Sequence, residues 1–345
     1  MSVSTFRMHR VIPGTAGTGS AAPPAPAGAL PFPSLTSTVP KELVHRASVA
    51  EVMLTDWARV EEHRFTVAAQ WPRGHSFFAT VDGCHDPLIT AETIRQAGIL
   101  LAHAEYGVPL GHHFLVSDLS VAVRPEHLRV GWSPASLELD ITCSGVKQRG
   151  GAVTGFRLEA RIHRDGSLAA TGGGTLTCIT PRVYQRLRTA RLPAGDSPRV
   201  IALTAPEPPQ TVGRMSPTDV VLSPTAEPHR WQLRVDTRHP VLFDHMVDHV
   251  PGMVLLEAAR QAAAATLGHA SLPLSLTSRF QRYVELDTPC LIEAHPTPTP
   301  TPTPATSTAT STGTGADRAE SVLVTAHQDG TPVFRCTVTM ASPAM

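Results

Sequence analysis

The chain has 345 residues, enough for two domains of ordinary size and some disordered sequence, since one domain spans roughly 100–200 residues. Its 29 basic and 29 acidic residues give a formal net charge of +0, so no field of one sign directs it to nucleic acid or an anionic membrane. No stretch approaches the roughly 20 consecutive apolar residues of a membrane-spanning helix. The five cysteines form no CxxC pair, which argues against a zinc knuckle or a disulfide framework. We therefore expect a soluble, cytoplasmic protein that binds neither nucleic acid nor membrane.

Two segments stand apart by composition. Residues 1–40 run through Gly, Ala and Pro without the continuous apolar region of a secretory signal, and residues 296–318 consist mainly of Pro, Thr, Ser, Ala and Gly. Neither can bury enough apolar surface to order itself. We predict a disordered tail at 1–40. Because strand-like runs flank the second segment, we predict a disordered loop at 296–318 inside a domain rather than a linker.

An internal repeat relates the two halves of the chain. Two histidines ten residues apart, then a proline and the block Glu-x-x-Arg-Gln-Ala, occur in the same order from His75 to Ala97 and from His239 to Ala262. The copies differ by one residue between the proline and the glutamate. Such a repeat indicates a duplicated structural unit. It predicts a first domain at 41–190, a linker at 191–215 and a second domain at 216–345.

Each copy has the pattern of a helix followed by a series of antiparallel strands. The helices are expected at about Pro87–Tyr106 and Pro251–Gly268, because proline suits a first helical turn and glycine a helix end. Further along, Asp-Gly pairs at Asp165 and Asp329 separate β-rich runs, which is a hairpin signal. The second helix is apolar on nearly every face, as suits a helix enclosed by a sheet. The predicted fold class is α+β, with two fused hotdog domains, each a long central helix wrapped by a curved antiparallel sheet.

Three blocks of sequence carry a resemblance to a known family. They are Val44–Trp57, His85–Gln96 and Asp248–Gln261. Through them the chain, from about Val44 to Met340, resembles the A-factor biosynthesis (AfsA-type) family, tandem-hotdog synthases of γ-butyrolactone signal precursors in actinomycetes. The resemblance implies transfer of a β-ketoacyl group from acyl carrier protein to the hydroxyl of dihydroxyacetone phosphate. It also implies essential residues at the positions of Glu92, Glu257 and Arg260.

The repeated Glu-x-x-Arg offers two of the groups that acyl transfer to a phosphorylated alcohol needs, a base for the hydroxyl and a cation for the phosphate. Residues three apart share one helix face, so Glu257 can accept the hydroxyl proton while Arg260 holds the phosphate. An apolar helix is expected to raise the pKa of Glu257 and make it a better base. Glu92 and Arg95 form the matching pair of the first half. The plain alternative for each pair is an intrahelical salt bridge.

The start of the second helix offers the third group. Backbone N–H groups at Gly252 and Met253 are candidate donors to an oxyanion, because the first amides of a helix have no partner within it. His249, His85 and His245 are candidate substrate-binding residues near the helix entrances, with a structural role as the alternative for His85 and His249. A third spaced ligand is lacking, so no metal is expected. Without a P-loop or a dinucleotide fingerprint, no organic cofactor is expected either.

Two other functions remain open from the sequence. The stretch Phe243–Glu257 resembles the active-site helix entrance of the β-hydroxyacyl-carrier-protein dehydratases, which leaves a hotdog dehydratase or thioesterase as an alternative. Arg260 and a shorter spacing before Pro251 depart from that pattern. A duplicated domain can also lose its chemistry, which leaves a catalytically silent acyl-binding paralogue. In every case the two halves are expected to form a pseudo-dimer within one chain and to share pocket residues.

Overall fold

The computed structural model describes residues 36–189, 200–269, 271–297 and 319–341. All the elements below lie in one compact unit, Ser37–Met345. The tail expected at 1–40 falls outside the described residues except for its last five, and the loop expected at 296–318 does so except for Pro296 and Thr297. Those two residues form the end of a strand and pair with Val322 and Ser321.

The two halves of the chain contain the same elements in the same order. The first half has the strands β1 (Leu54–Glu61) and β2 (Arg64–Trp71), the helix α1 (Pro87–Ala104), and the strands β3 (His113–Val123), β4 (Ala135–Arg149), β5 (Ala152–Arg164) and β6 (Ser167–Ile179). The second half has β7 (Leu222–Pro224), β8 (Arg230–Leu233), α3 (Gly252–Leu267), β9 (Pro273–Phe280), β10 (Cys290–Thr297), β11 (Glu320–Gln328) and β12 (Thr331–Met340). The short helix α2 (Pro181–Arg188) follows β6.

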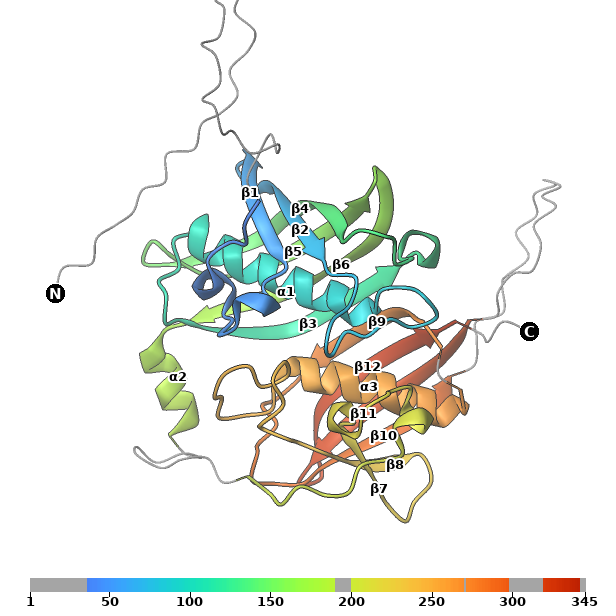
Figure 1. Ribbon diagram of the computed structural model, residues 1–345. Coiled ribbons are helices and arrows are strands. Elements are labelled where there is room, and N and C mark those ends of the chain that lie inside the picture. The colour runs from blue at the N-terminus through green and yellow to red at the C-terminus, as the bar shows by residue number, and fades with distance from the viewer. Residues whose placement is uncertain (1–35, 190–199, 270, 298–318, 342–345) are drawn as a thin grey trace, which may run out of the picture. The chain divides into compact units, whose positions relative to one another are not determined.

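The strands form one antiparallel sheet whose order is palindromic. It runs β1-β2-β4-β5-β6-β3-β9-β12-β11-β10-β8-β7, so matching strands of the two halves lie at equal distances from the β3–β9 junction. At this junction Ser120 pairs with Thr277 and Leu119 with Ser278. Figure 1 shows α1 lying along one half of the sheet and α3 along the other. The predicted α+β hotdog arrangement, with a central helix against an antiparallel sheet in each half, is confirmed.

The two central helices begin differently. Asp86 caps α1, because its Oδ1 accepts a hydrogen bond of 2.9 Å from the amide of Leu88. At α3 the N-cap residue is Pro251, and no side chain of the described residues caps the helix. Nearly all side chains of both helices are buried, which fits their apolar faces. None of the described helices is long and apolar enough to cross a membrane.

The duplication extends further back than the histidine repeat. The pattern Val-x-Arg-x-Ser-x-x-acid-Val occurs at Val44–Val52 and again at Val212–Val220. In each copy one short 3₁₀ turn ends at the first valine of this stretch and a second lies within it. A left-handed residue follows the first turn, His45 (φ 51) in the first copy and Gly213 (φ 69) in the second. The second stretch begins inside the segment that the sequence predicted to be a linker, where Val212 and Arg214 are buried.

Contact between α1 and β6 depends on a glycine. A Cβ atom added to Gly172 would lie 2.4 Å from the carbonyl oxygen of Ser120 on β3 and 2.6 Å from Cδ1 of Ile94 on α1. Both distances are shorter than real Cβ contacts, so a side chain here would push the helix and the strand apart. The glycine therefore sets how closely α1 packs on the sheet.

We expect Gly172→Ala to destabilise the fold by about 1–3 kcal/mol, the usual penalty for overpacking a core. Gly74→Ala is the matched control, since an added Cβ would meet nothing within 4 Å there and the backbone of Gly74 is not left-handed. Thermal unfolding of both variants measures the difference. Equal melting temperatures for the two would show that α1 does not pack this closely on β6.

Candidate active site

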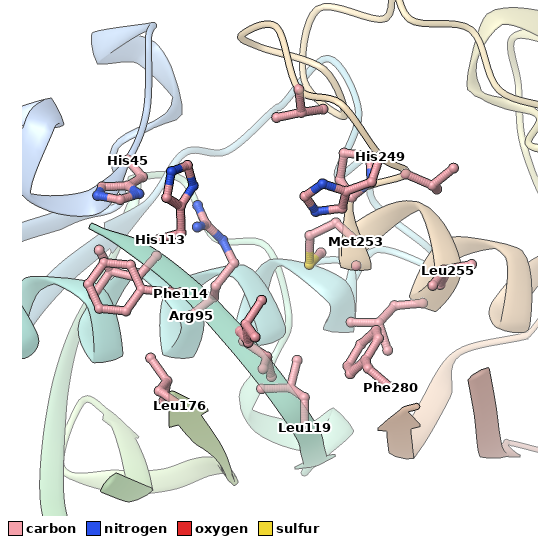
Figure 2. Close-up of a pocket in the computed structure, with 18 of the residues that line it drawn as sticks. His45, Arg95, His113, Phe114, Leu119, Leu176, His249, Met253, Leu255 and Phe280 are labelled. Carbon is pink, nitrogen blue, oxygen red and sulfur yellow. The ribbon is translucent and has the colours of Figure 1, made fainter. Parts of the chain in front are cut away.

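A pocket with a volume of about 550 Å³ is lined by residues from both halves of the chain. Figure 2 shows two kinds of wall: His45, Arg95, His113 and His249 gather in the upper part, and Leu119, Leu176 and Phe280 lie in the lower part. A pocket of this size suits a small ligand held by a few polar groups and an apolar chain. Its composition therefore fits a substrate with one polar and one apolar end.

The predicted site residues divide into two groups. Arg95, His245, His249, Gly252 and Met253 line the pocket. The other predicted residues are described by the structure but do not line the pocket: Glu92, Glu257, Arg260 and His85. His85 is buried against the Trp71 ring, with ring centroids 5.5 Å apart, and burial lowers its pKa to about 4. The structural alternative thus accounts for His85.

Glu92 is completely buried and holds two arginines in place. Nη2 of Arg46 lies 2.6 Å from Oε1, while Nε and Nη2 of Arg95 donate to the two oxygens at 2.9 and 2.8 Å. Gln96 donates a further hydrogen bond of 2.6 Å. Burial alone would raise the pKa of Glu92, but Arg46 and Arg95 outweigh it and lower the value to about 2. Arg46 and Arg95 line the pocket, whereas Glu92 is not among its lining residues.

Glu257 has the same surroundings in the second half. Arg214 donates from Nε at 2.7 Å, Arg260 from Nε and Nη2 at 2.9 and 2.6 Å, and Gln261 at 2.5 Å. Burial would again raise the pKa of Glu257, yet the two arginines lower it to about 2. The expectation that an apolar helix makes Glu257 a strong base is therefore wrong, because Arg214, which lies outside the helix, adds a second positive charge.

His249 is oriented by a carboxylate that the sequence analysis did not single out. Its Nδ1 lies 2.7 Å from Oδ1 of Asp248, which also accepts from the Tyr184 hydroxyl and, on Oδ2, from Nε of Arg188 at 2.9 Å. Burial would raise the pKa of Asp248, but these bonds lower it. An ionised carboxylate can only accept, so Nδ1 of His249 donates to Asp248, and within the described residues no hydrogen bond holds its Nε2. Tyr184 and Arg188 belong to α2 of the first half.

The first residues of α3 form the pocket wall next to His249. Gly252 and Met253 line the pocket, and Figure 2 shows Met253 beside His249. Because no described side chain caps this helix, its first amides remain available to an anion in the pocket. His245 also lines the pocket, with 47% of its side chain exposed and Nδ1 2.5 Å from Asp244.

We expect Glu257→Gln to cost about 3–5 kcal/mol of unfolding free energy, because it leaves two buried guanidinium groups without their anion. The pKa of Glu257 is depressed from 4.5 to about 2, so its contribution is fully present above pH 4.5 and is lost as the pH falls towards 2. Urea unfolding of the wild type and of Glu257→Gln measures their free energies of unfolding. The difference between the two should shrink as the pH falls below 4.5. The control is Glu61→Gln, whose exposed pair with Arg64 should be worth less than about 1 kcal/mol. A pH-independent difference would contradict the pairing.

The family model for the A-factor biosynthesis hotdog domain matches residues 29–180 and again 196–342. A 2-oxo-3-(phosphooxy)propyl 3-oxoalkanoate synthase of Streptomyces virginiae is 53% identical over 306 residues, covering 88% of this chain and 98% of that protein. A protein of the same name from Streptomyces griseus is 44% identical over 299 residues, covering 85% and 92%. Among solved structures, an acyl-ACP thioesterase from Bacteroides thetaiotaomicron is 10% identical with a TM-score of 0.45, covering 80% of this chain and 98% of that one. The resemblance predicted from the three sequence blocks is confirmed, and the chain belongs to the A-factor biosynthesis hotdog (AfsA) family.

Proposed function

We propose that this chain forms a 2-oxo-3-(phosphooxy)propyl 3-oxoalkanoate from a β-ketoacyl thioester and dihydroxyacetone phosphate, the reaction that fits the name of its relatives. That product is an ester of a β-keto acid with the hydroxyl of the phosphorylated triose. The observation that carries the proposal is the pocket shared by the two halves, in which a carboxylate-oriented histidine and an uncapped helix start face two arginines.

His249 is the proton acceptor in this proposal. Its Nε2 takes the proton of the acceptor hydroxyl while that oxygen attacks the thioester carbonyl and the C–O bond forms. Amides at the start of α3 stabilise the oxyanion of the tetrahedral intermediate. The intermediate then collapses, the C–S bond breaks, and His249 returns the proton to the leaving thiolate. Asp248 stabilises the imidazolium that exists between these steps.

Glu92 and Glu257 have a different role from the one the sequence suggested. Their oxygens are occupied by arginine and glutamine donors, and a pKa of about 2 makes each a poor proton acceptor. We propose that both carboxylates hold arginines in place. This role accounts for the essential positions that the family resemblance implies, without requiring either carboxylate to touch the substrate.

An acyl carrier protein is the proposed donor of the thioester. The pocket-lining Tyr184 lies on α2, whose outer face exposes Arg182 and Arg186 next to the exposed apolar side chains of Val183 and Leu187. A basic and apolar helix at the pocket suits an acidic carrier protein that delivers its acyl chain on a flexible arm. The apolar wall around Leu119, Leu176 and Phe280 is then the place for the acyl chain.

Mass spectrometry of the purified protein with a β-ketoacyl thioester, with and without dihydroxyacetone phosphate, tests the reaction. We expect a new phosphorylated ester only when the acceptor is present. Free acid or enoyl product without acceptor would instead identify a thioesterase or a dehydratase. A thioester that binds and is never consumed would identify a silent acyl-binding protein.

We expect His249→Gln to lower kcat by about 10²–10⁴-fold with a small change in KM, since the variant removes the base and keeps a polar side chain. Asp248→Asn should also lower kcat, because an amide no longer fixes the ring tautomer. His163→Gln is the control, for His163 also contacts an aspartate, Asp140 at 3.5 Å, and lies outside the pocket lining. Ester formation by the His249 variant at the wild-type rate would refute the assignment of the base.

A further inference from the structure

The two arginine clusters match in sequence and differ in access to the pocket. Arg46 and Arg95 around Glu92 correspond to Arg214 and Arg260 around Glu257. The side chain of Arg95 is 21% exposed, against 3% for its counterpart Arg260. Of the four arginines, Arg46 and Arg95 line the pocket. The arginine cluster of the first copy therefore borders the pocket, and the cluster of the second copy does not.

The second cluster is closed by residues that the first cluster lacks. The carboxyl group of Asp86 caps α1 and lies 3.8 Å from Nη1 of Arg214, and the ring of Phe77 packs under the same guanidinium at 4.3 Å. At the corresponding positions around Arg46 the chain has Val250 and Val241, which carry no carboxyl group and no ring. The backbone contact is the same in both, since Arg214 donates to the carbonyl of Phe77 and Arg46 to that of Val241. Asp86 and Phe77 thus cover Arg214, whereas Arg46 has Asp244 3.4 Å from its Nη1 and lies with Arg95 in the pocket lining.

Donor atoms remain unused in the open cluster. Arg95 binds Glu92 through Nε and Nη2, and its Nη1 makes no hydrogen bond within the described parts of the chain. Arg46 engages all three of its nitrogens, with Glu92, Val241 and Asp244. Asp244 is itself occupied by the amide of Ala47 and by His245. An incoming anion therefore meets the free edge of Arg95 first.

Two histidines lie in the pocket lining together with Arg95 (Figure 2). The His113 ring stacks on Tyr184 with centroids 3.6 Å apart, and Nε2 of His45 lies 3.0 Å from Nε2 of His103. His45 holds a left-handed backbone with φ 51, a conformation that costs about 1 kcal/mol or more for a residue other than glycine. Its counterpart in the second copy is Gly213, which adopts the same conformation without strain. An imidazole kept at this cost in the same pocket lining as the unused Nη1 of Arg95 points to a ligand.

We propose that Arg95, held by Glu92 and sharing the pocket lining with His45, binds the phosphomonoester group of the acceptor, and that its duplicated counterpart Arg260 does not. The inference rests on the proposed function and assigns one end of its acceptor. A phosphate at Arg95 directs the rest of the triose across the pocket towards His249, where the hydroxyl proton is accepted. Planar guanidinium donors and neighbouring imidazoles are well suited to phosphate oxygens.

The test compares dihydroxyacetone phosphate with unphosphorylated dihydroxyacetone as acceptor. We expect Arg95→Gln to lower kcat/KM for the phosphorylated acceptor by about 10- to 100-fold, the usual loss of a hydrogen bond to a charged group. Its kcat/KM for dihydroxyacetone should change by less than about threefold. Arg95→Lys should restore part of the preference, because it returns the charge without the planar donor. The matched control is Arg260→Lys, which keeps the buried charge and should keep the preference for the phosphorylated acceptor.

A second readout does not depend on turnover. Calorimetric titration of the wild type with glycerol 1-phosphate, a phosphomonoester that lacks the keto group, should show binding that Arg95→Gln weakens and Arg260→Lys keeps. If the wild type binds this probe through Arg95 but makes no ester, the proposed function fails and the phosphate site stands. No binding by the wild type, or an Arg95→Gln protein with unchanged binding and preference, would overturn the site.

His45→Gly guards against variants of Arg95 that fail to fold. This change installs the residue that the second copy has at the same position. Relief of the left-handed strain offsets the lost contact between His45 and His103, so the melting temperature should change little. We expect a higher KM for the phosphorylated acceptor and little change for dihydroxyacetone. An unchanged KM for both acceptors would remove His45 from the site.

Discussion

The structure depends on a buried carboxylate that forms ion pairs with two guanidinium groups, and the chain contains this arrangement twice. Each cluster joins three segments: a central helix, the 3₁₀ segment before the first strand of the same half, and the turn after a histidine in the other half. Arg46 reaches the carbonyl of Val241, and Arg214 reaches that of Phe77, so each half donates one arginine to the backbone of the other. Charges buried this deeply are costly unless every one is paired, which fixes the two halves against each other.

Much of this could be predicted from the sequence, because local patterns determine it. Apolar helices opened by proline, Asp-Gly hairpins and the histidine repeat predicted the two helix-and-sheet halves. The partners of Glu257 could not be predicted in the same way, since Arg214 lies 43 residues before it in an expected linker. The direction of the pKa shift of Glu257 was wrong because burial was visible in the sequence, whereas the added positive charge of Arg214 was not. The repeated Val-x-Arg-x-Ser pattern at Val44 and Val212 was the available signal.

Equivalent residues in the repeat differ in what surrounds them. His85 and His249 occupy the same place in the two copies, yet His85 is buried against Trp71 while His249 lines the pocket beside an uncapped helix. The residue after each histidine differs as well, since Asp86 caps the start of α1 and the corresponding Val250 cannot cap α3. Asp86 and Val250 are both visible in the sequence. From the sequence, however, a carboxyl group just before a helix predicts only a helix cap. That the cap also removes an anion site becomes visible when Arg214 is found beside it.

Fusion of the two copies into one chain is what permits this division of roles. In a homodimer each substitution occurs in both subunits, so an aspartate that closes one helix start closes both. In the fused chain the first half can lose its pocket and keep Arg46 and Arg95, while the second half keeps His249 and the open start of α3. The first half also contributes α2, whose Tyr184 and Arg188 hold Asp248 behind the histidine. The proposed proton acceptor and the proposed phosphate site thus come from different copies, and neither copy contains a complete site without the other.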